Sequence, residues 1–194
     1  MSTIVVVRKA GSAAIAADTC TSFGDLKMLG GYEVGLSKIM EYNGSYIALA
    51  GSPTHQLVLE SVFRRKGGRG RYAFDDKPTI FESLVRLHRV MKEDYFLAPN
   101  EEETDPYEST RFEMLIANRN GIFGVYALRE VGEYARFWAL GSGSDYALGA
   151  MYASYDRLGT AEEIAEIGIR AGAEFDVGTA LPLAVHSVRL ASGG

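Results

Sequence analysis

Residues 2–9, STIVVVRK, decide how the fold of this chain begins. Their centre, Ile4 to Val7, is a short β-branched run, and a second run of small and apolar residues, Ala13 to Ala17, follows the turn-forming KAGS of residues 9–12. Short runs of this kind between turn residues are typical of strands. Neither run alternates apolar with polar residues, so both faces of each strand should be covered. The sequence therefore predicts a buried β-hairpin at the N-terminus.

The remaining elements are predicted from turn and helix signals. Asn43-Gly44 is a strong two-residue turn signal and predicts a hairpin of residues 39–42 and 45–50. Pro53 opens a helix, and Thr160 with Glu163 forms a capping box at the start of another. The segment 19–37 is rich in glycine and turn formers and is expected to be a loop. Helices are expected at 53–63, 79–96, 145–155 and 160–173, and further strands at 112–117, 122–127, 133–140 and 179–190.

The order of these elements predicts the fold class. Strands come first, then two helices, strands, two helices and a last strand, which argues against a parallel, doubly wound sheet. Two antiparallel sheets stacked face to face, with a helix pair on each outer face, hide both sheets and explain the unbroken apolar runs. We therefore expect an α+β protein, a four-layer αββα sandwich, as a single domain of residues 1–194.

Composition excludes several classes of protein. The 194 residues carry a net charge of −5, which argues against nucleic acid as a partner, and the basic run of residues 64–71 is the exception. The single cysteine, Cys20, cannot form an internal disulfide and is interpreted as a packing residue. No apolar run reaches the roughly 20 residues that span a bilayer, and no signal peptide is recognised. A cytoplasmic protein without membrane contact is expected.

Ser2 carries the first chemical hypothesis. A small residue after the initiator Met1 favours removal of that methionine, which would leave Ser2 with a free α-amine beside its hydroxyl. An α-amine has an ordinary pKa of roughly 7.7–8.0, so near neutral pH it can accept the hydroxyl proton. Ser2 would then be a nucleophile that carries its own base.

Four features together resemble the opening of proteasome β-type subunits: STIVVVRK at 2–9, AIAADT at 14–19, a glycine-containing loop, and SKI at 37–39. The resemblance is greatest to the HslV branch and to the betaproteobacterial proteasome homologue, BPH. It implies the N-terminal-nucleophile (Ntn) hydrolase fold and a threonine-type endopeptidase that cleaves unfolded proteins inside stacked rings of six or seven subunits, with seven favoured. No cofactor and no metal site are implied.

The resemblance also assigns roles to residues. Asp18 and Lys38 match the family's Asp and Lys, and a cationic Lys38 beside the Ser2 hydroxyl would favour loss of its proton. Gly51 matches the residue whose backbone N–H forms the oxyanion site. Ser142, in the Gly141-Ser142-Gly143 segment, matches the serine that holds the terminal amine, although such a segment is also a common helix cap.

Further assignments concern an acidic partner of the amine and the substrate. Either Asp176 or Glu174 matches the family's second acid, and Asp176 is preferred because Thr179 follows it three residues later. The family pairs its substrate with backbone near Thr21, Ser22 and Gly51. The specificity pocket would be lined by Leu49, and Met40 and Pro53 are further candidates; such a pocket favours an apolar or small side chain.

Two departures from the family pattern support alternatives. Ser2 stands where the family has threonine, and the loop before Lys38 is longer than usual. These features favour a ring-forming subunit with little or no activity, and an amidohydrolase that acts on a small molecule is a further alternative. The basic run of residues 64–71 is either a solvated loop or a docking surface for an ATP-driven unfoldase, which the HslV resemblance suggests.

Overall fold

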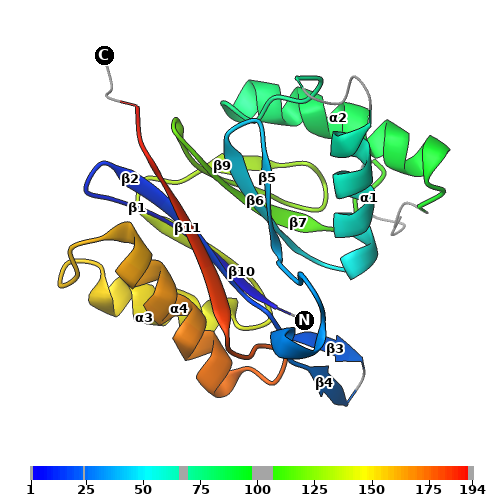
Figure 1. Ribbon diagram of the computed structural model, residues 1–194. Coiled ribbons are helices and arrows are strands. Elements are labelled where there is room, and N and C mark those ends of the chain that lie inside the picture. Colours follow the sequence, from blue (N-terminus) through cyan, green and yellow to red (C-terminus); the bar gives the residue numbers. More distant parts are fainter. Residues whose placement is uncertain (1, 24, 66–69, 98–106, 192–194) are drawn as a thin grey trace.

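The computed structural model describes residues 2–23, 25–65, 70–97 and 107–191. Within them the protein is a mixed α and β structure with antiparallel sheets and four α-helices (Figure 1). The helices are α1 (Pro53–Arg64), α2 (Lys77–Asp94), α3 (Ser144–Ser154) and α4 (Ala161–Phe175), with a short 3-10 helix η1 (Gly30–Tyr32). The strands are β1 (Thr3–Lys9), β2 (Ser12–Asp18), β3 (Thr21–Phe23), β4 (Leu26–Met28), β5 (Ile39–Tyr42), β6 (Ser45–Ala50), β7 (Glu113–Asn118), β8 (Gly121–Val125), β9 (Val131–Glu133), β10 (Phe137–Gly141) and β11 (Leu183–Arg189).

The strands form two large sheets and one small one. The four-stranded sheet has the order β10-β1-β2-β11, so the predicted N-terminal hairpin lies at its centre. The five-stranded sheet has the order β5-β6-β7-β8-β9, and β3 pairs with β4 in a separate hairpin. Every pairing is antiparallel. The start of β1 lies beside the end of β2, because Ile4 pairs with Ala17. The end of β2 also lies beside the start of β11, because Asp18 pairs with Leu183.

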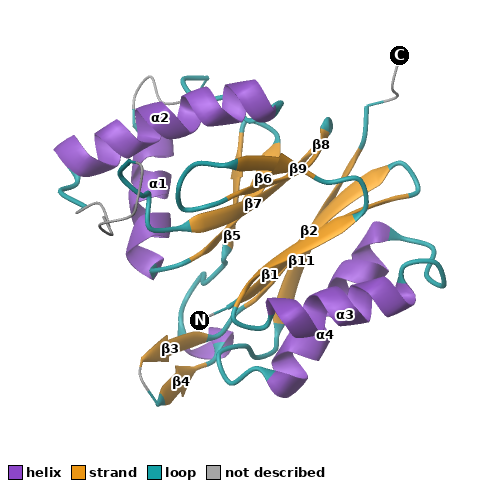
Figure 2. Ribbon diagram, turned by 180° about the vertical axis from the view of Figure 1, so that it is seen from behind, coloured by secondary structure: helices purple, strands orange, loops and turns teal. Residues whose placement is uncertain are grey.

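Three clusters of buried side chains account for the packing. Ile4 and Val6 pack with Leu115 and Ile122 of the other large sheet, whereas Val5 turns to the opposite face and packs with residues of α3 and α4. The third cluster joins α1 and α2 to the five-stranded sheet. In Figures 1 and 2 the two helix pairs lie on opposite sides of the molecule. This arrangement explains why β1 is apolar on both faces.

The structure corrects the predicted strand at 133–140. The segment forms two strands in different sheets: β9 pairs with β8, whereas β10 pairs with β1. Between them the chain crosses from one sheet to the other. The Tyr134 N–H still donates to the Ile122 carbonyl of the five-stranded sheet, whereas the Arg136 carbonyl accepts from the Arg8 N–H of the four-stranded sheet. One apolar stretch with no strong turn signal thus serves two sheets.

Two further differences concern segment boundaries. The segment 19–37, expected to be a loop, contains β3, β4 and η1, which are each only three residues long and too short to show a periodic pattern. Helix α2 begins at Lys77 because the Asp76 side chain accepts from the Thr79 N–H and closes a capping box. The expected last strand, 179–190, is observed only at Leu183–Arg189.

Candidate active site

Ser2, Asp18 and Lys38 meet where strands of both large sheets end. Ser2 directly precedes β1, Asp18 is the last residue of β2, and Lys38 directly precedes β5. The Lys38 ammonium donates to the Ser2 hydroxyl at 2.9 Å and to the two Asp18 carboxylate oxygens at 2.8 and 2.9 Å. Three N–H donors therefore have three oxygen acceptors, which is the geometry of a protonated lysine. All three side chains are buried.

Asp18 is held in place by backbone as well as by Lys38. The Thr3 N–H donates to one carboxylate oxygen at 2.9 Å, and the Cys20 N–H donates to the other at 2.8 Å. A fully buried carboxylate with four donors is compensated and fixed in direction. Asp18 therefore both fixes the start of β1 and aims the Lys38 ammonium at Ser2.

A second group of hydroxyls and one carboxylate lies beside the Ser2 backbone. The Ser142 hydroxyl donates to Asp176 at 2.7 Å and lies 3.4 Å from the Ser2 carbonyl oxygen. The Thr179 hydroxyl donates to the same Asp176 oxygen at 2.6 Å. The Thr179 proton is used there, so Thr3, whose hydroxyl is 2.7 Å away, is the donor to Thr179.

The geometry distinguishes the two acidic candidates. Asp176 is the C-cap of α4, and the Thr179 N–H donates to its carbonyl, so the segment turns its carboxylate toward Ser142. Glu174, two residues earlier, is solvent-exposed. Burial raises the pKa of Asp176, but the hydrogen bonds from Thr179, Ser142 and the Gly178 N–H outweigh it and hold the pKa below its ordinary value.

Gly51 lies between β6 and α1, beside the same site. Its φ of +152° is a conformation that favours glycine, and a β-carbon there would lie 3.3 Å from Phe112 Cβ. Ser52 then caps α1 by accepting from the Thr54 N–H. The bare backbone of Gly51 is thus exposed at the wall of a cavity that Ser2 also lines.

This cavity has a volume of about 200 Å³ and contains the predicted substrate-binding residues. Thr21, Ser22, Leu49 and Gly51 line it together with Ser2 and Lys38, and so does Pro53. Met40, the other pocket candidate, does not: it packs in the core under α1 and α2. Met40 is two residues past Lys38 on β5, where its side chain belongs to the helix-covered face.

Sequence reasoning missed several lining residues and one tether. The missed lining residues are Cys20, Phe23, Glu33, Leu36, Ser52 and Gln56. Gln56 also donates to the Ser37 carbonyl at 2.6 Å and so ties the first turn of α1 to the residue before Lys38. A polar residue in the first turn of a helix carries no signal of such a long-range contact. For Cys20, the sequence offers one indication that it lines the cavity, which is its position two residues after Asp18.

The described part of the chain was compared with the requirements of two other kinds of site, a metal centre and a membrane span, and meets neither. No group of three or more His, Cys, Asp or Glu side chains there could hold a metal ion. Among the same residues, no helix combines the length and apolar character needed to cross a bilayer.

No protein-family model and no curated protein matches the chain. Two solved structures of BPH from Thiobacillus denitrificans do match over 98% of this chain and 100% of theirs: one has 41% identity and a TM-score of 0.92, and the other, in complex with epoxomicin, has 40% and 0.90. HslV from Trypanosoma brucei matches with 19% identity and a TM-score of 0.68 over 96% of this chain and 99% of that one, which shows the fold alone.

The fold is therefore that of the proteasome and HslV class, with antiparallel sheets, four helices and a serine, lysine and aspartate gathered at the start of β1. Within this class, the chain shares 40% and 41% of its residues with the two BPH structures over 98% of its length, which is enough to assign its family. The chain belongs to the family of the betaproteobacterial proteasome homologue, BPH.

Proposed function

We propose that this protein is a proteasome-type endopeptidase subunit whose nucleophile is the Ser2 hydroxyl after removal of Met1. In this proposal residues 1–194 form one four-layer αββα domain of the Ntn-hydrolase type. The observation that carries it is the 2.9 Å hydrogen bond from Lys38 to Ser2, with Asp18 on the other side of the same ammonium. That arrangement places a fixed positive charge where an alkoxide would form.

The first chemical step follows from this charge. The α-amine of Ser2 accepts the hydroxyl proton, and the oxygen attacks the carbonyl carbon of the peptide bond. Lys38 keeps its proton and stabilises the developing negative charge on the attacking oxygen. The carbonyl oxygen becomes an oxyanion and takes the Gly51 backbone N–H as donor.

The second step releases the products. The C–N bond breaks as the terminal ammonium returns its proton to the leaving amine, which leaves an ester between Ser2 and the acyl group. Water then attacks the ester carbon with the same amine as base. The bond from that carbon to the Ser2 oxygen breaks, the ammonium returns its proton to this oxygen, and the acid product leaves. Ser142 and Asp176 contribute by holding the amine in place, which is consistent with their position beside the Ser2 backbone.

The substrate would lie as an extended strand along backbone of Thr21, Ser22 and Gly51. Such pairing recognises the main chain and so tolerates many sequences. Selectivity then depends on the cavity of about 200 Å³, where Leu49 supplies an apolar wall. A small or apolar side chain next to the cleaved bond is the preference that this lining supports.

The proposed assembly is a double ring of stacked six- or seven-subunit rings, seven favoured, in the cytoplasm. Membership in the BPH family and the HslV-like fold support a ring-forming subunit. A closed ring would admit only unfolded polypeptide, delivered by an ATP-dependent unfoldase. The basic run 64–71 is a candidate docking surface for it, but residues 66–69 of that run lie outside the described residues.

Three variants test the nucleophile. Ser2→Ala should abolish hydrolysis of casein and of short peptides by the assembled protein, whereas Ser2→Thr, which restores the usual family residue, should keep it. Ser187→Ala, at an exposed position of β11, is the matched control and should be unaffected. Intact mass establishes whether Met1 has been removed from each preparation. Full activity of Ser2→Ala would refute the mechanism.

The same experiment separates the alternatives. A processed, assembled parent without activity on any peptide would favour a structural ring subunit. An active monomer or dimer on size analysis would favour a small amide as substrate. Epoxomicin, bound in one BPH structure, is a useful probe: it should block the parent, and Ser2→Ala should fail to bind it.

A further inference from the structure

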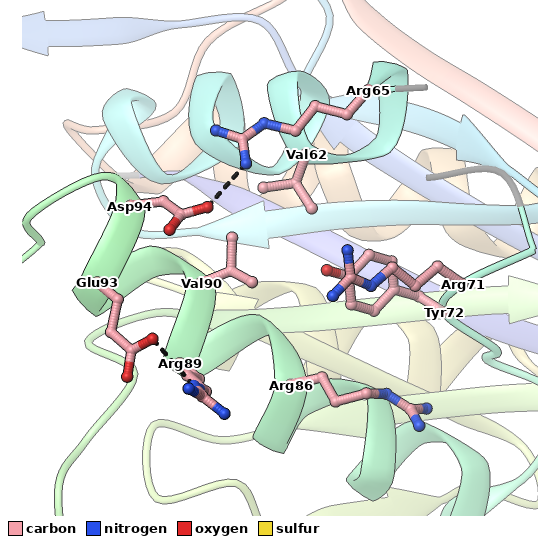
Figure 3. A pocket seen from close by; sticks show the side chains of 9 residues that line it. All are labelled: Val62, Arg65, Arg71, Tyr72, Arg86, Arg89, Val90, Glu93 and Asp94. Atoms are coloured by element: carbon pink, nitrogen blue, oxygen red, sulfur yellow. Dashed lines mark hydrogen bonds and ion pairs between the residues drawn. The ribbon is translucent and has the colours of Figure 1, made fainter. Parts of the chain in front are cut away.

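A second cavity, of about 570 Å³, lies between the end of α1 and the middle and end of α2 (Figure 3). Its lining comes from α1, from α2 and from the Arg71-Tyr72 segment that precedes α2. The lining residues are Val62, Arg65, Arg71, Tyr72, Arg86, Arg89, Val90, Glu93 and Asp94. None of them lines the cavity beside Ser2.

The charges of this lining are unequal. Its described residues include four arginines and two carboxylates. The Arg65 guanidinium binds Asp94 at 2.7 Å, and Arg89 binds Glu93 at 2.9 Å, as the dashed lines in Figure 3 show. Both acidic side chains of the lining are thereby occupied. Among the described lining residues, no carboxylate is left to balance the charges of Arg71 and Arg86.

The charges of three lining arginines act on the same residue, Tyr72. Its ring is buried, and burial raises the pKa of its hydroxyl, while the positive charges of three lining arginines oppose that rise. The Arg71 guanidinium also lies over the Tyr72 ring, 6.0 Å from its centroid. Arg65, Arg71 and Arg86 therefore lie near enough to Tyr72 to act on it, and all four arginines line the same cavity as Tyr72.

Two net positive charges at this hollow contrast with the net charge of −5 on the whole chain. A planar guanidinium donates two parallel hydrogen bonds to phosphate oxygens. A single exposed arginine binds such a group weakly, because solvent and salt screen the charge. Several arginines around one hollow favour a ligand with more than one phosphate group, and the volume is in the range of small-molecule pockets.

We propose that this cavity binds the polyphosphate chain of a small molecule, with Arg71 and Arg86 as its principal charge partners. The phosphates would lie between these two guanidinium groups and the paired Arg65 and Arg89. The apolar walls, Val62 and Val90, leave room for a non-phosphate part. The site is independent of the proposed peptidase chemistry, since the two cavities share no lining residue.

Calorimetric titration of the full chain tests the site. Sodium tripolyphosphate and ADP are titrated at constant ionic strength, so that an inorganic chain and a nucleotide are compared, and hexaglutamate serves as a non-phosphate polyanion. Arg71→Gln/Arg86→Gln is the test variant. Arg119→Gln/Arg157→Gln removes the same charge at two exposed positions outside the cavity and is the matched control.

The expected result is one site per chain, weakened at least tenfold in the test variant and less than twofold in the control. Arg71→Lys/Arg86→Lys keeps the charge but loses the two-pronged geometry, and it should also bind several-fold more weakly. Tighter binding of ADP than of tripolyphosphate would identify a nucleotide site, and the reverse an inorganic chain. The proposal would be overturned if neither phosphate compound bound, or if hexaglutamate bound as tightly as they do. It would also be overturned if the test variant and the control variant lost affinity equally. Thermal unfolding of each variant verifies that it is folded.

Discussion

Gly141 lies so close to Ser2 that a β-carbon at Gly141 would be 2.1 Å from the Ser2 carbonyl oxygen. Its φ is +96°, and Thr3 pairs with it across β1 and β10. Glycine is therefore required both by the backbone conformation and by the contact. The end of β10 thus sets the position of the chain immediately before β1, where the proposed nucleophile lies.

Gly141→Ala should therefore displace the start of β1. We expect a loss of about 2–3 kcal/mol in the free energy of unfolding, because relieving the contact requires the backbone at Gly141 or at Ser2 to move. Denaturant unfolding measures it. Gly149→Ala is the control: it lies within α3 with no atom within 4 Å of the new carbon. The control should stabilise the protein by about 0.5–1 kcal/mol, and an equal effect of both variants would contradict the close approach.

Lys38→Met should separate charge from shape at the site. The methionine fills similar space but removes the ammonium, so the rate of peptide hydrolysis should fall about 100-fold or more. Asp18 would keep two backbone donors and lose its counter-ion, which should cost about 3 kcal/mol of stability. Hydrolysis rates and urea unfolding are the measurements.

A companion variant distinguishes these two effects. Lys38→Met/Asp18→Asn removes the unpaired charge and should recover part of the stability, while activity stays lost. If the double variant recovered activity as well, the ammonium would not be needed for the chemistry.

Thr179→Val should weaken the hydrogen-bonded group beside Ser2. Asp176 would lose the 2.6 Å bond, and the Thr3 hydroxyl would lose its acceptor. Because a buried polar group left without a partner costs about 1–3 kcal/mol, stability should fall within that range. Thr3→Val/Thr179→Val leaves no unpaired hydroxyl and should be less destabilised than the sum of its single variants. Additive losses would show that the two hydroxyls do not interact.

Much of the fold was predictable because its signals are local. Asn43-Gly44 placed the β5–β6 hairpin at its observed boundaries, and the Thr160 capping box placed the start of α4. The chain crossing at residues 134–136 was not predictable, since a single apolar stretch does not reveal which sheet each half joins. The short strands β3 and β4 were not predicted either, because three residues are too few to show the alternation of apolar and polar side chains that marks a strand.

The site was predictable to a different extent. The resemblance selected Ser2, Asp18 and Lys38, which the fold brings within hydrogen-bonding distance although they are far apart in sequence. It did not reveal Gln56, whose contact with Ser37 depends on how α1 packs against the end of the loop. Met40 was assigned to the pocket by proximity in sequence, but its side chain packs in the core under α1 and α2 and does not line the cavity.

Asp176 should make a pH-dependent contribution to stability. Its pKa is depressed in the folded protein, so the folded state favours the charged carboxylate relative to an unfolded aspartate of pKa about 3.9. The contribution is present above that value and is lost as the pH falls through the lower, folded-state pKa. Asp176→Asn should therefore lower Tm at pH 7 by about 2–4 °C, the shift for roughly 1 kcal/mol in a domain of this size. The difference from the parent should shrink as the pH falls below about 4.

Glu174→Gln, two residues earlier and exposed, is the control and should have the Tm of the parent at every pH. If the Tm of Asp176→Asn stayed below that of the parent by a constant amount down to pH 2, the carboxylate charge would play no part.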